Sequence, residues 1–331
     1  MHFALLHAII QPMYYKGPPS DHFDGKQFFN PWFPYTHSLW TVIKWRLTCQ
    51  PKPWPKKLPG LPSTMPSKRV EGTQLKVTFI GHSTTLIQTE NLNILTDPIW
   101  SESASPFGLG IKRARPPGVK FEDLPPIDLV LITHNHYDHM DMATIGRLTE
   151  RDDPLFLTPL GNDAIIKSKI TRARIVALDW SERHVFKDLT ILLEPSQHWS
   201  SRKGFDKNQA LWGAFVLSTP NGNIYYAGDT GYADIFKWAK EKYGEFRLAI
   251  LPIGAYEPRW FMKPFHMNPD DAVKAYFDLG EPQTIAVHFG TFKLSDEGID
   301  EPILDLKQAM DKHHVDPTKI AALQPGEEIF I

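Results

Sequence analysis

The ten residues 132–141 constrain this chain more than any other part of it. They contain three histidines and two aspartates, and they follow the apolar residues 129–132 directly. Such a density of imidazoles and carboxylates would be costly in a core, but it suits divalent metals, above all zinc. The spacing His134-x-His136-x-Asp138-His139 can serve two ions. His134 and His136 point the same way in an extended stretch, and Asp138 and His139 follow where the chain turns and can face a second ion. The alternative is a polar turn with incidental histidines, which further ligands elsewhere in the chain argue against.

Composition limits the classes of protein that this chain can belong to. It has 331 residues, 42% of them hydrophobic and 22% charged, with a net charge of −2. One large or two ordinary domains fit this length, and nothing predicts nucleic-acid binding. The single cysteine, Cys49, excludes an intramolecular disulfide and a thiolate metal cluster. Any metal must therefore be held by His, Asp or Glu.

No apolar run reaches the roughly 18 residues of a membrane-spanning helix. The apolar residues 1–10 are short and lack the basic region and cleavage site of a secretory signal. These observations predict a cytoplasmic protein with at most a peripheral membrane contact.

Residues 1–71 differ from residues 72–331. Six prolines fall within residues 51–66 and exclude regular structure there. Residues 37–48 are typical of a helix with Leu39, Trp40, Ile43 and Leu47 on one face. We expect an N-terminal arm whose aromatic residues pack on the main domain. The second interpretation is an interfacial anchor with tryptophan at the level of lipid headgroups.

From residue 72 onward the pattern alternates between strands and helices. The predicted strands are residues 75–80, 84–88, 93–96, 129–132, 155–158, 174–177, 190–194, 212–218, 224–227, 248–251 and 284–287. The predicted helices are residues 142–150, 161–167, 233–243, 268–279 and 303–312. Early strands form hairpin-like pairs and later ones alternate with helices, which predicts an α/β protein with two mixed sheets facing each other and helices outside.

Three more apolar runs end in a residue that can bind a metal: His198, Asp229 and His288. Glycines flank Asp229 and allow the backbone to approach closely. Strand ends that meet at one edge of a sandwich would bring these residues to the first cluster.

The ordered motifs resemble those of the metallo-β-lactamase superfamily over residues 72–331. The motifs are residues 81–85, 96–98 and 134–139, His198, residues 228–230 and His288. Within that superfamily, the chain is similar to the N-acylphosphatidylethanolamine-hydrolysing phospholipase D family, including its bacterial members. The segments that carry this second resemblance are residues 20–31, 96–106, 195–199, 252–262 and 266–272.

The resemblance implies a four-layer αβ/βα sandwich that binds two zinc ions. It places His134, His136 and His198 on one zinc, and Asp138, His139 and His288 on the other, with Asp229 bridging. Asp97 would lie beneath the site and orient a ligand, as carboxylates behind metal ligands do. His82 is expected to support the site by hydrogen bonding. Imidazole and carboxylate sites also accept iron or manganese.

Asp97, Asp138 and His266 are the expected catalytic residues, with His266 as a phosphate contact or general acid. The expected substrate-binding residues combine aromatic and polar side chains, which suits an amphiphile with an anionic head, and ordinary packing at the rim is the alternative. They are Gln197, Trp199, Tyr256, Arg259 and Trp260.

The leading hypothesis is a zinc phosphodiesterase of phospholipase D type. It would cleave N-acylphosphatidylethanolamine-type lipids to phosphatidic acid and an N-acylethanolamine. One alternative is a lactonase or small-molecule phosphodiesterase that resembles the ascorbate-6-phosphate lactonases. An apolar groove at the metals would favour the lipid substrate. A small, closed, polar pocket would favour a lactone substrate. A third hypothesis is a non-catalytic metal-binding scaffold. The relatives also imply a homodimer.

Overall fold

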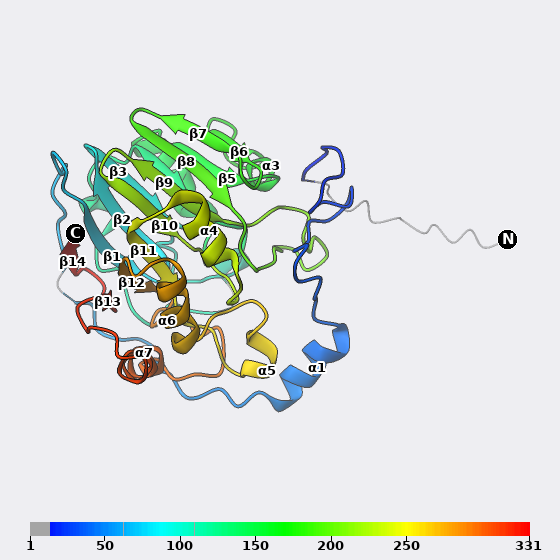
Figure 1. The fold of residues 1–331 in the computed structure, drawn as a ribbon. Coiled ribbons are helices and arrows are strands. Elements are labelled where there is room, and N and C mark those ends of the chain that lie inside the picture. The colour runs from blue at the N-terminus through cyan, green and yellow to red at the C-terminus, as the bar shows by residue number, and fades with distance from the viewer. Residues whose placement is uncertain (1–13, 62, 109) are drawn as a thin grey trace.

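Two mixed β-sheets form the centre of the structure, a computed structural model that describes residues 14–61, 63–108 and 110–331 (Figure 1). The first sheet has the order β14-β1-β2-β3-β4-β5-β6. Its strands are β1 (Lys76–Gly81), β2 (Thr84–Thr89), β3 (Leu92–Thr96), β4 (Leu129–Leu131), β5 (Leu155–Pro159), β6 (Arg174–Leu178) and β14 (Glu328–Phe330). The second sheet has the order β13-β12-β11-β10-β9-β8-β7. Its strands are β7 (Arg183–Phe186), β8 (Leu189–Glu194), β9 (Ala214–Thr219), β10 (Gly222–Tyr226), β11 (Phe246–Pro252), β12 (Gln283–Val287) and β13 (Ile320–Ala321).

Each sheet is antiparallel in one half and parallel in the other. In the first sheet, β14 to β3 pair antiparallel and β3 to β6 pair parallel. In the second, β7 to β10 pair antiparallel and β10 to β13 pair parallel. The parallel halves need crossover connections, which is where helices interrupt the strands. The predicted pair of mixed sheets is confirmed.

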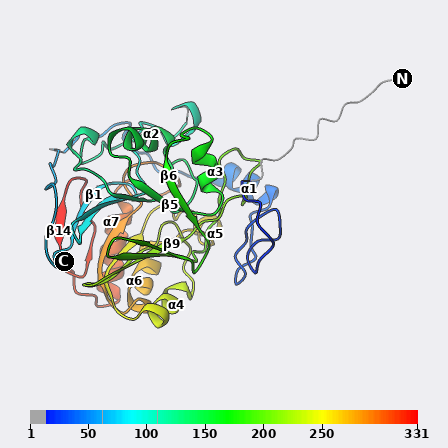
Figure 2. The same ribbon diagram turned by 90° about the horizontal axis from the view of Figure 1, so that it is seen from above.

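Seven α-helices lie outside the two sheets in the described part of the chain. They are α1 (Leu39–Thr48), α2 (Met142–Arg151), α3 (Asn162–Lys167), α4 (Ile235–Tyr243), α5 (Arg259–Met262), α6 (Pro269–Asp278) and α7 (Glu301–Lys312), with short 3-10 helices at Pro106–Gly108 and Phe121–Asp123. Figure 2 shows α2 and α3 on one side of the molecule and α4 and α6 on the opposite side. The layers therefore run helix, sheet, sheet, helix, which confirms the predicted four-layer sandwich.

Side chains along β4 point alternately into two parts of the core. Leu129 and Leu131 belong to the cluster between the sheets, whereas Val130 and Ile132 pack in the cluster beneath α2 and α3. Both faces of β4 are buried because one faces the other sheet and the other faces helices. The metal-binding segment therefore begins at a rigid, fully buried strand.

Three short strands and one short helix were not predicted from the sequence. β7 lies at a sheet edge and is half exposed, and β13 and β14 have only two and three residues. α5 has four residues. Such short elements are held by their neighbours in space and not by their own hydrophobic pattern.

The described part of the N-terminal arm packs on the sandwich through aromatic residues. Phe23 and Phe28 are buried and belong to the largest hydrophobic cluster of the described residues. The His22 ring stacks on Trp180, and its Nε2 lies 2.7 Å from a carboxylate oxygen of Asp179. The apolar residues 1–10 lie outside the described residues, and the domain division at residue 71 stays a prediction.

Helix α1 presents most of its apolar side chains to solvent. Val42 and Trp45 pack on the cluster that contains Phe261 of α5, and Figure 1 shows the two helices side by side. The predicted apolar face points outward instead, since Leu39, Trp40 and Leu47 are 72%, 78% and 80% exposed. Within the described ranges, no helix has both the length and the apolar character that crossing a membrane requires.

We predict that the His22–Asp179 ion pair makes stability depend on pH. Burial lowers the pKa of His22, but the hydrogen bonds with Asp179 and Asp21 outweigh it and raise that pKa above its ordinary value. The stabilisation is therefore complete below the unfolded pKa of about 6.5 and is lost as pH rises through the folded value. Asp179→Asn should lower the free energy of unfolding by about 2 kcal/mol at a pH of about 5.5 and much less at a pH of about 9.

Urea unfolding at both pH values measures this difference. Asp21→Asn is the control and should have a smaller effect, because Asp21 is exposed and its charge is screened. Equal losses for Asp179→Asn at both pH values would show that the pair contributes packing and not charge.

Candidate metal centre

The candidate metal ligands follow the carboxyl ends of strands from both sheets. The segment 134–139 follows β4 in the first sheet, whereas His198, Asp229 and His288 follow β8, β10 and β12 in the second. Because these ends meet at one edge of the sandwich, all seven predicted ligands lie within three neighbouring groups, two of which share His198. The groups that contain them are His82, Asp138, His139 and His288; His134, His136 and His198; and His198, Asp229 and His266, with ligand atoms in each group within 4.8 Å of one another.

Three imidazoles converge in the first group. Nε2 of His134 lies 2.8 Å from Nδ1 of His136, and Nε2 of His198 lies 3.3 Å from the same atom. Nδ1 of His198 donates to the carbonyl of Phe265 over 3.0 Å, so its Nε2 carries a lone pair that faces the other two rings. This arrangement can hold one cation.

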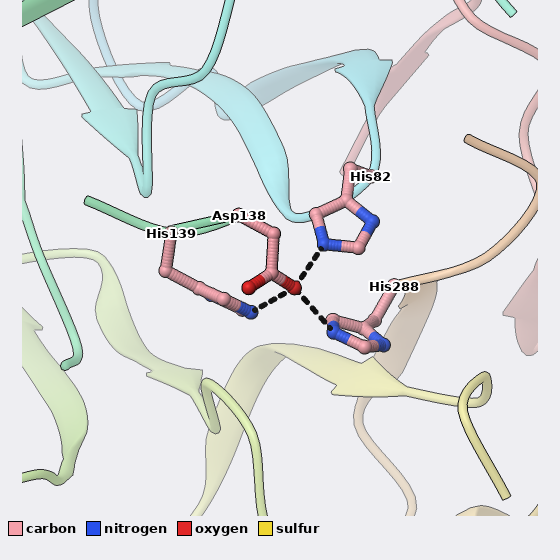
Figure 3. A group of neighbouring side chains, drawn as sticks. All are labelled: His82, Asp138, His139 and His288. Carbon is pink, nitrogen blue, oxygen red and sulfur yellow. Dashed lines mark hydrogen bonds and ion pairs between the residues drawn. The ribbon is translucent and has the colours of Figure 1, made fainter. Parts of the chain in front are cut away.

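The second group surrounds Asp138. Figure 3 shows His82, His139 and His288 directed at one carboxylate oxygen of Asp138, at 2.9, 3.4 and 3.4 Å from their Nε2 atoms. Nε2 of His139 and His288 also lie 3.2 and 3.1 Å from Oδ2 of Asp229. Asp229 further approaches His198 at 3.9 Å, so it stands between the two groups.

The pKa values follow from burial and from the two carboxylates. Burial lowers the pKa of His136 to about 4 and that of His198 to about 3, so both are neutral at neutral pH. Burial also acts on His288, but Asp229 and Asp138 outweigh it and raise its pKa to about 9. The negative charge that retains a proton on His288 would equally stabilise a metal cation in its place.

The donor atoms fit divalent metal ions. Several buried nitrogen and oxygen atoms of the site have no hydrogen-bond partner, and they include Nε2 of His136, Oδ1 of Asp229, Nδ1 of His266 and Nδ1 of His288. Buried polar atoms without partners are rare, and clusters of them mark a missing ligand. Imidazole and carboxylate donors in this number suit zinc, iron or manganese.

Asp97 organises the site from below, where the sequence predicted it. Its Oδ2 accepts from the hydroxyls of Thr133 and Tyr226, each over 2.6 Å, and from Nδ1 of His139 over 2.7 Å. Donation from Nδ1 leaves Nε2 of His139 free to face Asp138 and Asp229. Tyr226 was missed by sequence reasoning, since it ends a strand as an ordinary buried aromatic.

Three residues of the site have a backbone conformation that is uncommon outside glycine. His82, Asp97 and His288 have positive φ angles of 57°, 32° and 63°. Such conformations persist in non-glycine residues where the surroundings force them, and they often mark functional sites. A Cβ atom on Gly228, next to Asp229, would lie 2.7 Å from a methyl group of Thr133, so only glycine lets these two strand ends meet.

A cavity of about 580 Å³ opens onto the centre. His136, Asp138, Asp229 and His266 form its polar end. The rest of its wall is mainly apolar and comes from α1, α5 and nearby loops. These apolar residues are Val42, Trp45, Trp199, Ala255, Phe261, Met262, Phe265 and Leu294.

Only some of the residues predicted to act on substrate line this cavity. Trp199 and His266 do, and Nδ1 of His266 has no hydrogen-bond partner. Gln197 instead bonds to Trp32 and to the carbonyl of Pro264.

Three further residues lie outside the cavity wall. The hydroxyl of Tyr256 donates to Asp305, and Trp260 lies under the ammonium of Lys44 at 4.9 Å. Arg259 donates to the carbonyl of His266 and to Asp271, so it holds the His266 backbone in place. The substrate-binding roles of these residues stay predictions.

The N-terminal arm also supports the ligand loops. The amide of Asn30 donates to the backbone carbonyl of His198 over 2.9 Å. Nothing in the local pattern around Asn30 predicted this contact, because it joins residues that are far apart in the chain.

This fold and this cluster define a metal-dependent hydrolase, and comparison with known proteins agrees. The model of the family described as "Beta-lactamase superfamily domain" matches residues 92–289. The chain belongs to that superfamily. The N-acyl-phosphatidylethanolamine-hydrolyzing phospholipase D 1 of Caenorhabditis elegans is 38% identical over 266 residues, which cover 76% of this chain and 75% of that protein. An uncharacterized protein of Mycobacterium tuberculosis is 37% identical over 266 residues, which cover 79% of this chain and 70% of the relative.

Solved structures support the fold. A metallo hydrolase from Ignicoccus hospitalis has a TM-score of 0.57 and 21% identity, and the match covers 78% of this chain and 98% of that one. An isothiocyanate hydrolase from Delia radicum gut bacteria has a TM-score of 0.62 and 23% identity, with 77% and 98% covered. At these sequence identities, the similarity shows a shared fold and nothing about function.

We predict that Tyr226→Phe weakens metal binding without unfolding the protein. Loss of the hydroxyl removes one donor from Asp97, which orients His139, and such changes lower metal affinity about tenfold to a hundredfold. Competition with a chromogenic chelator measures the affinity for zinc. Tyr225→Phe is the matched control, because Tyr225 is a buried neighbour that belongs to the core. Equal affinities in both variants would contradict the role assigned to Tyr226.

Proposed function

We propose that this protein is a phospholipase D that hydrolyses N-acylphosphatidylethanolamine-type lipids to phosphatidic acid and an N-acylethanolamine. The observation that carries the proposal is the shape and lining of the 580 Å³ cavity, which has a polar end at the metal centre and a mainly apolar wall. Ligand pockets of roughly 300–1,000 Å³ hold molecules of lipid-fragment size. A lactonase would need a small, closed, polar pocket instead. The similarity to the Caenorhabditis elegans phospholipase D supports the same substrate class.

Seven residues would hold two divalent ions, zinc in the first instance. His134, His136 and His198 would bind one ion, and Asp138, His139 and His288 the other, with Asp229 between them. Two ions bound here would supply Lewis acidity toward a phosphoryl group and would activate water at neutral pH.

The chain's own residues orient the ligands and the substrate. Asp97 holds His139 in the tautomer that leaves Nε2 free. His266 faces the cavity beside Asp229, with its Nδ1 at 3.9 Å from Oδ2, and it can donate one N–H to a phosphate oxygen. Burial lowers the pKa of His266 to about 3, which favours this contact over a role as a general acid. Phe261, Met262 and Phe265 would contact hydrocarbon chains and exclude water.

The reaction breaks the bond between phosphorus and the head-group oxygen. Water contributes its oxygen and one proton to the phosphate product, and its second proton to the N-acylethanolamine. No co-reactant other than water is needed.

Metal content and lipid turnover together test the proposal. We expect close to two zinc ions per chain and cleavage of N-palmitoyl-phosphatidylethanolamine in mixed micelles to the two named products, identified by mass spectrometry. His288→Ala should lose metal and nearly all turnover while its circular dichroism is retained. Turnover of bis-p-nitrophenyl phosphate without turnover of the lipid would overturn the lipid assignment and leave a small-molecule phosphodiesterase. Zinc binding without any turnover would indicate a non-catalytic scaffold.

We also infer that α1 lies against the membrane surface from which the lipid is taken. Its residues Val42 and Trp45 line the cavity, while Leu39, Trp40 and Leu47 project into solvent. Exposed tryptophan and leucine beside Lys44 and Arg46 are typical of a helix at a lipid interface. The homodimer implied by the family resemblance stays a prediction.

We predict that Trp40→Ser combined with Leu47→Ser lowers activity on phospholipid vesicles about tenfold, because less apolar surface enters the interface. Hydrolysis of bis-p-nitrophenyl phosphate should stay within twofold of wild type. Trp238→Ser, at an exposed tryptophan of α4, is the control. Equal losses on vesicles and on the soluble diester would show that α1 supports the cavity and not membrane contact.

A further inference from the structure

Two cationic side chains line the active-site cavity without a carboxylate partner. Lys207 and Arg46 both belong to its wall. Over residues 14–61, 63–108 and 110–331, neither side chain forms an ion pair. The ammonium of Lys207 donates to the hydroxyl of Thr36 and lies 5.6 Å from the centroid of the Trp199 ring.

The environment of Lys207 favours a ligand with negative charge. The side chain is partly buried, and burial alone lowers its pKa. A buried charge is normally compensated by an opposite charge. Lys207 also lines a neighbouring hollow of about 220 Å³, so it stands where the two spaces adjoin.

Carboxylates near Lys207 are already engaged. Asp138 and Asp229, which line the same cavity, lie within 3.4 Å of histidine nitrogens of the metal centre. Asp24, in the neighbouring hollow, accepts from the backbone N–H groups of Lys26 and Gln27, each over 2.7 Å. The cavity therefore offers free positive charge away from the ligands.

Trp199 connects Lys207 to the reaction centre. Its ring lies 4.4 Å from that of His136, between centroids, and beneath the Lys207 ammonium. A substrate whose phosphate occupies the centre would extend past Trp199 toward Lys207.

We propose that Lys207 binds a second anionic group of the substrate, a carboxylate, separate from the phosphodiester that is cleaved. The inference rests on the proposed function and refines its substrate class. Head groups that end in a carboxylate would be preferred over neutral acyl chains of equal length.

A matched pair of lipids tests the proposal. N-glutaryl-phosphatidylethanolamine carries a terminal carboxylate, and N-pentanoyl-phosphatidylethanolamine has the same chain length without it. We expect wild-type protein in neutral detergent micelles to have about a tenfold lower KM for the glutaryl lipid, the size of effect that a charged hydrogen bond produces. Lys207→Met should abolish this preference with kcat within twofold, and Lys207→Arg should retain it.

Lys203→Met is the control variant. Lys203 belongs to the same loop, is exposed, and lies over the Tyr14 ring instead of in the cavity wall. It should keep the preference for the carboxylate lipid. Equal KM values for the two lipids in wild-type protein, or a preference that survives Lys207→Met, would overturn the proposal.

Failure of the proposed function would be recognised separately. If the metal-loaded protein hydrolyses neither lipid, both can be titrated at equilibrium by tryptophan fluorescence. Tighter binding of the glutaryl lipid, lost in Lys207→Met, would then support the anion site while the phospholipase assignment falls. Equal binding of both lipids would overturn the anion site as well.

Discussion

The rest of the site depends on the hydrogen bonds that the carboxylate of Asp97 accepts. It lies at the end of β3 and accepts hydrogen bonds from Thr133 and His139, which follow β4, and from Tyr226 of β10. One buried oxygen thereby joins both sheets and fixes the orientation of a metal ligand. Without a partner this charge would be costly to bury, and with several donors it is stabilised. The strained backbone of Asp97 is held in place by the same contacts.

Around Asp97, burial and the neighbouring carboxylates have opposite effects on the charge of the imidazoles. Burial favours neutral imidazoles at His136 and His198, whereas Asp138 and Asp229 favour a charged imidazole at His288. Metal ions bound here would resolve this conflict, because each would neutralise the carboxylates and accept the imidazole lone pairs at once. The unsatisfied buried atoms of the cluster are consistent with the same conclusion.

The metal centre and the substrate cavity come from different parts of the molecule. Strand ends of the sandwich supply the ligands, while α1, α5 and the loop that carries Lys207 supply the cavity wall. The arm also holds a ligand loop directly, through Asn30 and the carbonyl of His198. The sandwich therefore places the candidate ligands, and the arm and loops form the cavity beside them, a division common among enzymes with rigid scaffolds.

The sequence by itself determined the architecture and the candidate metal-binding cluster. The spacing of His134 and His136 reflects side-chain alternation along an extended stretch, and His139 follows where the chain turns. His198, Asp229 and His288 were visible because each follows an apolar run. These patterns involve only residues that are close together in the chain, so a single sequence is enough to detect them.

Only the tertiary structure decided which side chains support the candidate site and which line the cavity. Tyr226, Phe265 and Lys207 carry no local signal, and Tyr256 and Arg259, although close to the motifs in the sequence, bond to Asp305 and Asp271 outside the cavity wall. The direction in which such a side chain points is set by packing between segments far apart in the chain. Hydrophobic periodicity encodes which residues are buried, but not which neighbours they meet.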